Sequence, residues 1–466
     1  MSANGGSELA FRVAGLLKTD APWEVVGERA RRYELHLQGT QVELERGPVA
    51  VEGFGVRLLR PRGTTLGVGF QASTDASPAG VAAAVETAGQ VAQHGEFPAK
   101  AVELPGGAAS APSVPVVDPK LWADPLGALR DYVDTLLGGF DGRSGVVPSF
   151  GSVKAMLAEL TLSNSSGLRV SYPSTVVELE LAIKAFGGPE GPPPGEFWVN
   201  DTARRLEPEL VGDRVDAWCR YAADVRRAVP PPTGELPVLL PTEVLEGILP
   251  TVVGTRLGAG ARLRKIAPEV GAKVGVPELT IRDEGDHAWS PGSGPYDDEG
   301  RPRRKTTLVD RGVVAGHLYD TLYGSALGSP STSNASRWSV GPTSSLRFPH
   351  APSPGTSTVV VQPGDGGTLE ELAEEAGDGV LVTQLGWAIP DPITSSFGGE
   401  IRIGYRIRGG KVAEPLRGGT VGGSALAPPG QPSLLHSLAS IGSTASRSGA
   451  FVSPPLLVKP LTVAGA

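Results

Sequence analysis

The side chains best suited to metal binding or nucleophilic catalysis in this chain are its histidines and its one cysteine. Cys219 lies in AWCRYA with no histidine near it, so we expect a small buried apolar side chain there and no nucleophile. No histidine shares a helical turn with another, and none has the spacing of a metal site. We therefore expect a surface or hydrogen-bonded role for each: His36, His94, His287, His317, His350 and His436.

One histidine, His287, stands beside carboxylates in RDEGDHAW. These carboxylates could bind a hard cation, but DEGD lacks the longer Asp/Asn alternation and the final glutamate of a calcium loop, so we expect a solvated turn. The glycine-rich GAGARL and GFGVRL lack the context of nucleotide loops, and no GxSxG joins a strand to a helix. No nucleophile and base can be paired from the sequence, which disfavours a stand-alone hydrolase.

Two glutamates lie in the apolar, helix-like run LLPTEVLEGILPTVVGT, residues 239–255. Glu243 and Glu246 are three residues apart and would share a helix face, but two carboxylates without imidazole or thiolate suit Mg or Ca better than catalytic zinc. Thr242 is a plausible N-cap, so we expect Glu243 to complement the helix N-terminus, and Pro250 should interrupt the helix one turn later.

The composition excludes several classes of partner. The chain carries 42 basic and 50 acidic residues, a net charge of -8, with no basic stripe, so we expect no nucleic-acid partner. No segment approaches the ~20 uninterrupted apolar residues of a membrane span, and the N-terminus lacks a signal-peptide pattern. We therefore expect a cytoplasmic protein with no membrane partner.

Periodicity indicates an α+β fold with two domains. In the first half, alternating runs such as YELHLQGTQVELERG and TLGVGFQAST predict a strand meander, followed by the helix SPAGVAAAVETAGQVAQ. Further helices are expected near 125–138 and 208–228. The prolines of VPPPTGE place a boundary between an N-terminal sheet-and-helix domain, 1–230, and a strand-rich, largely antiparallel domain, 236–466.

The second half also contains collinear blocks that carry a family resemblance. They are DDEGRPRRKTTLVDRGVVAGHLYDTLYGSALG, STSNASR, DGVLVTQLGW, SSFGGEIRIGYRIRGGKVAEPLRGGTVGG and PPLLVKPLTVAG. These blocks resemble the TldD/PmbA family, and YELHL, GFGVRLL, GFQASTD and NSSGLRV extend the likeness to the first half. Of these, IRIGYRIRGGKV also predicts a hairpin by its Gly-Gly turn between alternating runs.

The resemblance implies which arm of the family this chain represents. The zinc-binding TldD arm has His-Glu-x-x-x-His, with a C-terminal cysteine as third ligand. Here a motif starting at Pro241 would need histidines at 241 and 246, and one starting at Thr242 would need them at 242 and 247. Neither register has a histidine, and the C-terminal segment offers Ser446 and Ser448 where the zinc-binding arm has its cysteine. The resemblance thus implies the metal-free TldE (PmbA) arm.

Two functions follow as hypotheses. The first is a non-catalytic subunit of a heterodimeric zinc peptidase, without a cofactor of its own, whose TldD-like partner carries the zinc and which cleaves unfolded or small modified peptides. The alternative is a stand-alone peptide-binding or scaffold protein, a homodimer with the same fold and no proteolytic role. Candidate substrate-channel residues are Ser333, Asn334, Gln384 and Trp387; turn capping is the competing role for Ser333 and Asn334.

Overall fold

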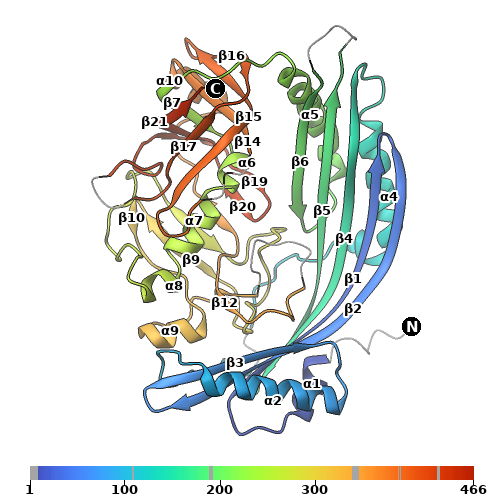
Figure 1. Ribbon diagram of the computed structural model, residues 1–466, viewed down its shortest axis with the longest axis vertical. Helices are drawn as coiled ribbons and strands as arrows, with labels where there is room; N and C mark the ends of the chain where they lie inside the picture. The colour runs from blue at the N-terminus through green and yellow to red at the C-terminus, as the bar shows by residue number, and fades with distance from the viewer. Residues whose placement is uncertain are drawn as a thin grey trace.

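A computed structural model describes residues 9–107, 110–187, 193–337, 346–386, 388, 390–427 and 431–465. Figure 1 shows a tall curved sheet formed by the first half of the chain beside a group of shorter strands formed by the second half. Both halves mix helices with sheets, and most neighbouring strands are antiparallel. The predicted α+β class is confirmed.

The N-terminal sheet has six strands in the order β3-β2-β1-β4-β5-β6, with every neighbouring pair antiparallel. Alternation places Tyr33, Leu35 and Leu37 on one buried face. The predicted meander is confirmed, and the strand order leaves β6 as a free edge of the sheet. The bounds are β1 (Trp23–Gln38), β2 (Gln41–Arg62), β3 (Thr65–Ser73), β4 (Val146–Asn164), β5 (Arg169–Ala185) and β6 (Gly195–Ala203).

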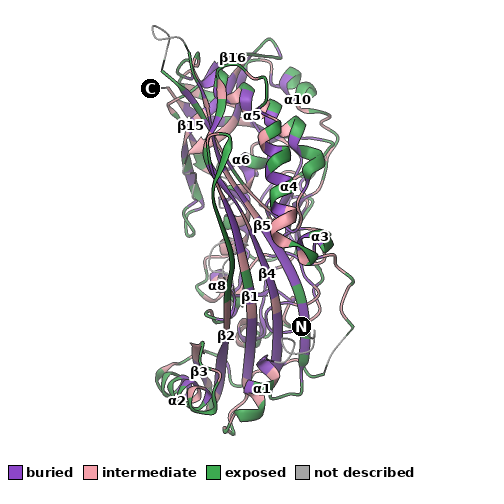
Figure 2. Ribbon diagram, turned by 90° about the vertical axis from the view of Figure 1, so that its right-hand side faces the viewer, coloured by how far each residue is buried: buried purple, intermediate pink, exposed green. Residues whose placement is uncertain are grey.

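Helices α4 and α5 lie against one face of this sheet, as Figure 2 shows. Helix α5 buries Val215, Cys219 and Ala222 at helical spacing, so the expected apolar role of Cys219 is confirmed. No helix in the described part of the chain is long and apolar enough to span a membrane. The helices of this half are α1 (Leu9–Leu16), α2 (Pro78–His94), α3 (Pro119–Ala123), α4 (Pro125–Gly138) and α5 (Val211–Val225).

The second half contains a closed ring of five strands, β14-β7-β21-β17-β15, because β14 also pairs with β15. Closure leaves the ring, here called the barrel, without a free edge. Strand β16 extends β15, and β18 pairs with β21. The bounds are β7 (Gly234–Leu240), β14 (Gly379–Gly386), β15 (Ser396–Arg408), β16 (Lys411–Leu416), β17 (Thr420–Ser424), β18 (Leu438–Ile441) and β21 (Leu456–Ala464).

A second sheet of this half has the order β10-β9-β8-β13-β20-β19, and two short strands, β11 (Ala335–Ser336) and β12 (Ser353–Pro354), pair with each other. Only β14–β7 and β13–β20 are parallel among the paired strands described, which confirms the largely antiparallel prediction. The sheet comprises β8 (Ile281–Glu284), β9 (Lys305–Asp310), β10 (Val313–Val314), β13 (Val359–Val361), β19 (Ser446–Ser448) and β20 (Phe451–Ser453).

One local signal in the second half, the predicted hairpin, is confirmed. The β15–β16 hairpin turns at Gly409 and Gly410, whose φ angles of +53° and +79° suit glycine. Helix α10 (Leu369–Ala376) starts with a capping box between Thr368 and Glu371. The run 239–255 differs from its helix-like pattern, because its first residues complete β7 and two short helices follow. These are α6 (Thr242–Glu246) and α7 (Leu249–Arg256), with α8 (Ala259–Leu263) and α9 (Thr321–Leu327) further on.

The two halves share one hydrophobic core. Leu239, Leu381 and Ile403 of the barrel pack in the same cluster as Leu181 of β5 and Val215 of α5. Burial of apolar surface across the contact is the main force that holds such layers together. The predicted domain division between 230 and 236 falls between β6 and β7 and stays a prediction, since the core is continuous across it.

Buried charges also connect the halves. The guanidinium of Arg57, 1% exposed, pairs with Glu24 of β1 and lies 2.6 Å from Glu299 of the second half. A second contact joins Arg347 to Asp298 at 3.1 Å, while the backbone N–H of Arg347 donates to Glu28 of β1 at 2.6 Å. Buried ions need such pairing to offset their desolvation, so these contacts fix how the halves are oriented.

Candidate functional site

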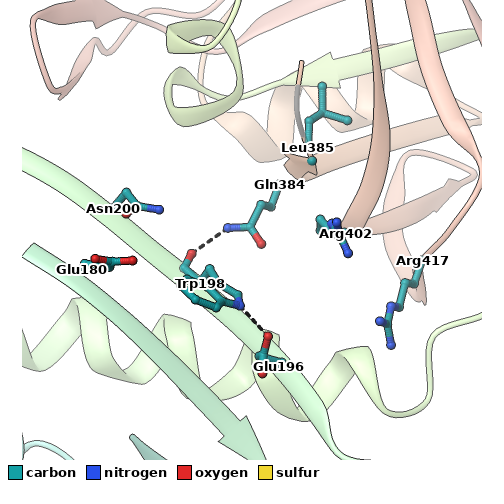
Figure 3. A pocket seen from close by; sticks show the side chains of 9 residues that line it. Glu180, Glu196, Trp198, Asn200, Gln384, Leu385, Arg402 and Arg417 are labelled. Carbon is teal, nitrogen blue, oxygen red and sulfur yellow. Dashed lines mark hydrogen bonds between the residues drawn. The ribbon is translucent and has the colours of Figure 1, made fainter. Parts of the chain in front are cut away.

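A cleft separates the edge strand β6 from barrel strand β14. It consists of two adjoining pockets with volumes of about 610 and 630 Å³. Both are lined by Trp198 and Asn200 of β6 and by Gln384 and Leu385 of β14. Figure 3 shows the smaller pocket, with residues of β6 facing the end of β14. A concave site between two structural layers is the usual place for a ligand.

Gln384 bridges the cleft. Its side-chain Nε2 donates a hydrogen bond of 2.7 Å to the backbone carbonyl of Trp198, drawn as a dashed line in Figure 3. The pairing of β14 with β15 shifts register on both sides of Gln384. Such an irregularity can redirect a side chain out of a regular ladder. One of the predicted channel residues therefore lies in the cleft.

The free edge of β6 points into this gap. The carbonyl of Thr202 accepts a 3.1 Å hydrogen bond from Arg447, as that of Trp198 does from Gln384. Outward-pointing backbone groups recur at every second residue of a strand paired on one side. The N–H and carbonyl of Asn200, midway between them, therefore point toward the cleft as well. Side chains of the second half thus occupy part of an edge that could otherwise pair with another strand.

The larger pocket reaches helix α6, where it is lined by Glu243, Glu246 and Gly247 and by Ser448 of β19. The hydroxyl of Ser448 donates a hydrogen bond of 3.0 Å to Glu246. Burial raises the pKa of the Glu246 carboxyl, with this hydrogen bond acting in the opposite direction. Glu243 and Glu246 both line this pocket, which agrees with the shared helix face predicted from their spacing.

Thr242 has a different role from the one predicted. The N-cap of α6 is Pro241, which makes no side-chain capping bond. The Thr242 hydroxyl instead lies 2.6 Å from that of Ser446 and donates to the carbonyl of Ser453 at 2.7 Å. The N-cap prediction for Thr242 was wrong, because the approach of β19 and β20 gave its hydroxyl stronger tertiary partners.

The contact between Thr242 and Ser446 bears on zinc binding, because it lies where the resemblance to the TldD arm would place metal ligands. The register that keeps Glu243 puts ligand positions at Thr242 and Gly247, and the fold brings Thr242 directly against Ser446. Two hydroxyls and a glycine do not fit zinc, which prefers imidazole and thiolate. Among the described residues, no group of three or more histidine, cysteine, aspartate or glutamate side chains is placed to hold a metal.

Ser333 and Asn334 lie elsewhere, directly before β11, and their hydrogen-bond partners belong to the second half of the chain. Asn334 is 1% exposed, and its Nδ2 donates to Asp283 at 2.6 Å. Ser333 is 7% exposed and has a φ of +63°, a turn conformation. Neither lines the cleft with Gln384, so their predicted contact with substrate is untested and gains no support from their position. Trp387 lies outside the described residues.

Two of the family-like blocks pack against each other beside Asn334. The backbone N–H of Arg337, at the end of STSNASR, donates to Asp298 of DDEGRPRR at 2.7 Å. The N–H of Ala335 donates to Asp297 at 3.2 Å. These two blocks thus pack together near the buried pair of Arg57 and Glu299. Two other blocks line the cleft, since DGVLVTQLGW contains Gln384 and SSFGGEIRIGYRIRGGKVAEPLRGGTVGG contains Arg402 and Arg417.

Several cleft residues carried no recognisable signal in the sequence. Trp198 and Asn200 stand in the strand GEFWVNDTA, Arg402 lies within the predicted hairpin, and Arg417 follows it. An alternating strand gives no indication of which edge will face another layer. These residues became candidates only through their position.

Comparison with known proteins assigns this fold to a protein family. Residues 233–465 match the family model described as the PmbA/TldA metallopeptidase C-terminal domain. The chain belongs to the TldD/PmbA family.

Relatives and solved structures agree with this assignment. A zinc metalloprotease TldD homolog of Saccharolobus solfataricus is 30% identical over 42% of this chain, and a metalloprotease TldD homolog of Haemophilus influenzae is 26% identical over 43%. These alignments span 42% and 40% of the relatives' own lengths. The crystal structure of TldE from Thermococcus kodakarensis matches 98% of this chain and 99% of that one, with 20% identity and a TM-score of 0.78, which establishes a shared fold.

Proposed function

We propose that this chain is the metal-free, TldE-like subunit of a heterodimeric zinc peptidase whose partner carries the His-Glu-x-x-x-His site. The observation that carries the proposal is the hydroxyl pair of Thr242 and Ser446. At the positions where the TldD arm would place a histidine and a cysteine, this chain has side chains that bond to each other. The chemistry of peptide hydrolysis would then belong to the partner.

In this proposal the cleft holds an extended segment of the peptide substrate. An added strand needs an edge with outward N–H and carbonyl groups, and β6 offers those of Trp198, Asn200 and Thr202. The amide of Gln384 now donates to Trp198 as a backbone N–H of such a strand would. A bound peptide would displace Gln384 and take over its hydrogen bond. Recognition through backbone groups would suit unfolded peptides of varied sequence.

Co-expression with a chain that carries His-Glu-x-x-x-His tests this function. We expect a stable one-to-one complex, one zinc per heterodimer, and cleavage of an unfolded test protein that stops when the zinc is chelated. A partner variant with glutamine in place of the motif glutamate should form the complex without cleaving. The absence of both a stable complex and zinc-dependent proteolysis would contradict the proposal, as would stoichiometric zinc in this chain alone.

A stand-alone peptide-binding protein is the second candidate. It is favoured by one observation, namely that both walls of the cleft come from this one chain. Under this alternative the purified chain would bind unfolded peptides as a homodimer and would not associate with the zinc-bearing chain. The oligomeric state measured with and without that chain separates the two candidates.

A further inference from the structure

The smaller pocket has walls of opposite charge. Glu180 of β5 and Glu196 of β6 line one side, and Arg402 of β15 and Arg417, which follows β16, line the other. Figure 3 shows the two arginines on the side of the pocket away from Glu180. Among the described residues, no ion pair joins the two walls. The pocket therefore holds separated charges of both signs on either side of Trp198.

The charged groups that do pair have partners on their own wall. Glu196 lies 3.7 Å from Lys184, and Arg402 lies 3.4 Å from Glu400, with each of these side chains about one third or more exposed. Pairs this exposed are weak, generally worth ~1 kcal/mol or less. A ligand carboxylate could therefore compete for Arg402 at little cost.

The backbone that carries the two arginines is fixed. Arg402 stands between Ile401 and Ile403, both completely buried in the barrel. The N–H of Arg417 donates to the carbonyl of Val229 at 3.0 Å, and the next residue, Gly418, donates to Ile401 at 2.8 Å. Both guanidiniums project from a rigid backbone, so binding a ligand costs little backbone entropy at these two positions.

A glycine makes room for one of them. A Cβ atom added at Gly386 would lie only 2.7 Å from Nε of Arg402. Because glycine leaves this space free, the Arg402 side chain can lie across the end of β14 toward the pocket. Arg417 is an exposed residue, so its planar guanidinium is accessible to a carboxylate, to which arginine can donate two parallel hydrogen bonds.

We propose that Arg402 and Arg417 form a carboxylate-binding subsite for the extended peptide held along β6. The inference rests on the proposed function only in that it takes a peptide to be the occupant of the cleft. The carboxylate belongs either to the C-terminus of the peptide or to an aspartate or glutamate side chain. Trp198 supplies an apolar surface beside it, and Glu180 and Glu196 disfavour a second negative group at the opposite wall.

Binding of labelled peptides to the purified chain tests the subsite. The probes are an N-terminally labelled hexapeptide of alanine and valine with a free C-terminal carboxylate, its C-terminally amidated form, and amidated forms carrying one internal glutamate or glutamine. We expect the free-acid peptide, the glutamate peptide, or both to bind about tenfold more tightly than their neutral counterparts. The free-acid and glutamate probes identify which source the subsite uses.

The double substitution R402Q/R417Q should remove this preference and leave binding of the neutral peptides unchanged. The matched control is R408Q, which removes an exposed arginine of the same strand that pairs with Glu414 away from the pocket. Equal affinity for charged and neutral peptides in the unmodified chain, or a preference that survives in R402Q/R417Q, would overturn the inference.

This test is separate from that of the proposed function. A chain that forms the zinc-dependent complex but shows no carboxylate preference would refute the subsite alone. A chain that binds none of the peptides, alone or in the complex, would refute the subsite together with the peptide cleft.

Discussion

The hydroxyl oxygens of Thr242 and Ser446 lie 2.6 Å apart although 204 residues separate them in the chain. Helix α6 and strand β19 meet at this point, beside the larger pocket of the cleft. The contact selects Ser446 rather than Ser448 as the neighbour of Thr242, since Ser448 bonds to Glu246. It thereby defines three positions, 242, 247 and 446, at which zinc ligands could be introduced.

A chain with T242H, G247H and S446C should bind zinc. A Cβ at position 247 would have its nearest described neighbour 3.5 Å away, so there is room for a side chain there. Histidine is larger than the buried threonine, and we expect a stability loss of about 1–3 kcal/mol without metal. Zinc should raise the melting temperature of this variant and leave that of the unmodified chain unchanged. The matched control replaces S446C with S448C and should bind zinc more weakly; equal affinity of the two would contradict the placement.

Removing the Gln384 amide should open the edge of β6. In Q384A the hydrogen bond to Trp198 is lost, which should lower the free energy of unfolding by about 1 kcal/mol. Peptide affinity should rise, because no side chain needs to be displaced. Urea denaturation and peptide titration measure the two effects. Q90A, which removes an exposed glutamine of α2, is the control, and lower peptide affinity in Q384A would indicate that Gln384 contacts the peptide directly.

Stability should depend on pH through the buried carboxyl of Asp297. Burial, together with the neighbouring Glu299, raises the pKa of Asp297 to about 7. The folded state thus binds this proton more tightly than the unfolded state, so the contribution is full below about pH 4 and is lost as the pH rises through 7. The free energy of unfolding should fall by up to about 1.4 kcal/mol per pH unit within that window.

The substitution D297N should flatten this dependence, whereas D365N, at an exposed aspartate, should not. Urea denaturation at several pH values between 4 and 8 gives the slopes. An unchanged slope in D297N would assign the pH dependence to another group.

Breaking the buried charge contact between the halves should be costly. In R57Q, the carboxylates of Glu24 and Glu299 lose their common partner inside the protein, which should cost about 3–5 kcal/mol. R130Q removes an exposed partner of Glu45 and should have little effect on the melting temperature. Comparable losses in the two variants would mean that the buried pair is no stronger than a surface one.

Elements governed by neighbouring residues could be predicted. The β15–β16 hairpin follows from two glycines between alternating runs, and α10 follows from Thr368 and Glu371 at capping-box spacing. The run 239–255 was harder, because its apolar residues suit both a buried strand and a helix, and Pro241 and Pro250 divide it. The first residues of this run form a strand because β7 pairs with β21 and β14 in the tertiary structure.

The cleft could not be predicted in the same way. Trp198 and Gln384 are 186 residues apart, and nothing near either residue encodes their contact. Ser333 and Asn334 show the reverse case, since polar residues in a turn-like segment were expected near substrate and are buried among residues of the second half. The residue type alone does not show whether a polar side chain contacts a ligand or forms a hydrogen bond with a buried partner.

The sequence by itself determined the α+β class, the family blocks and the types of side chain available, including the lack of histidine at positions 241, 242, 246 and 247. Only the tertiary structure decided that Thr242 meets Ser446, that Gln384 reaches the edge of β6, and that Arg402 and Arg417 share a pocket. The physical reason is that local propensity depends on neighbours along the chain, whereas a site depends on which strands pair and which layers pack.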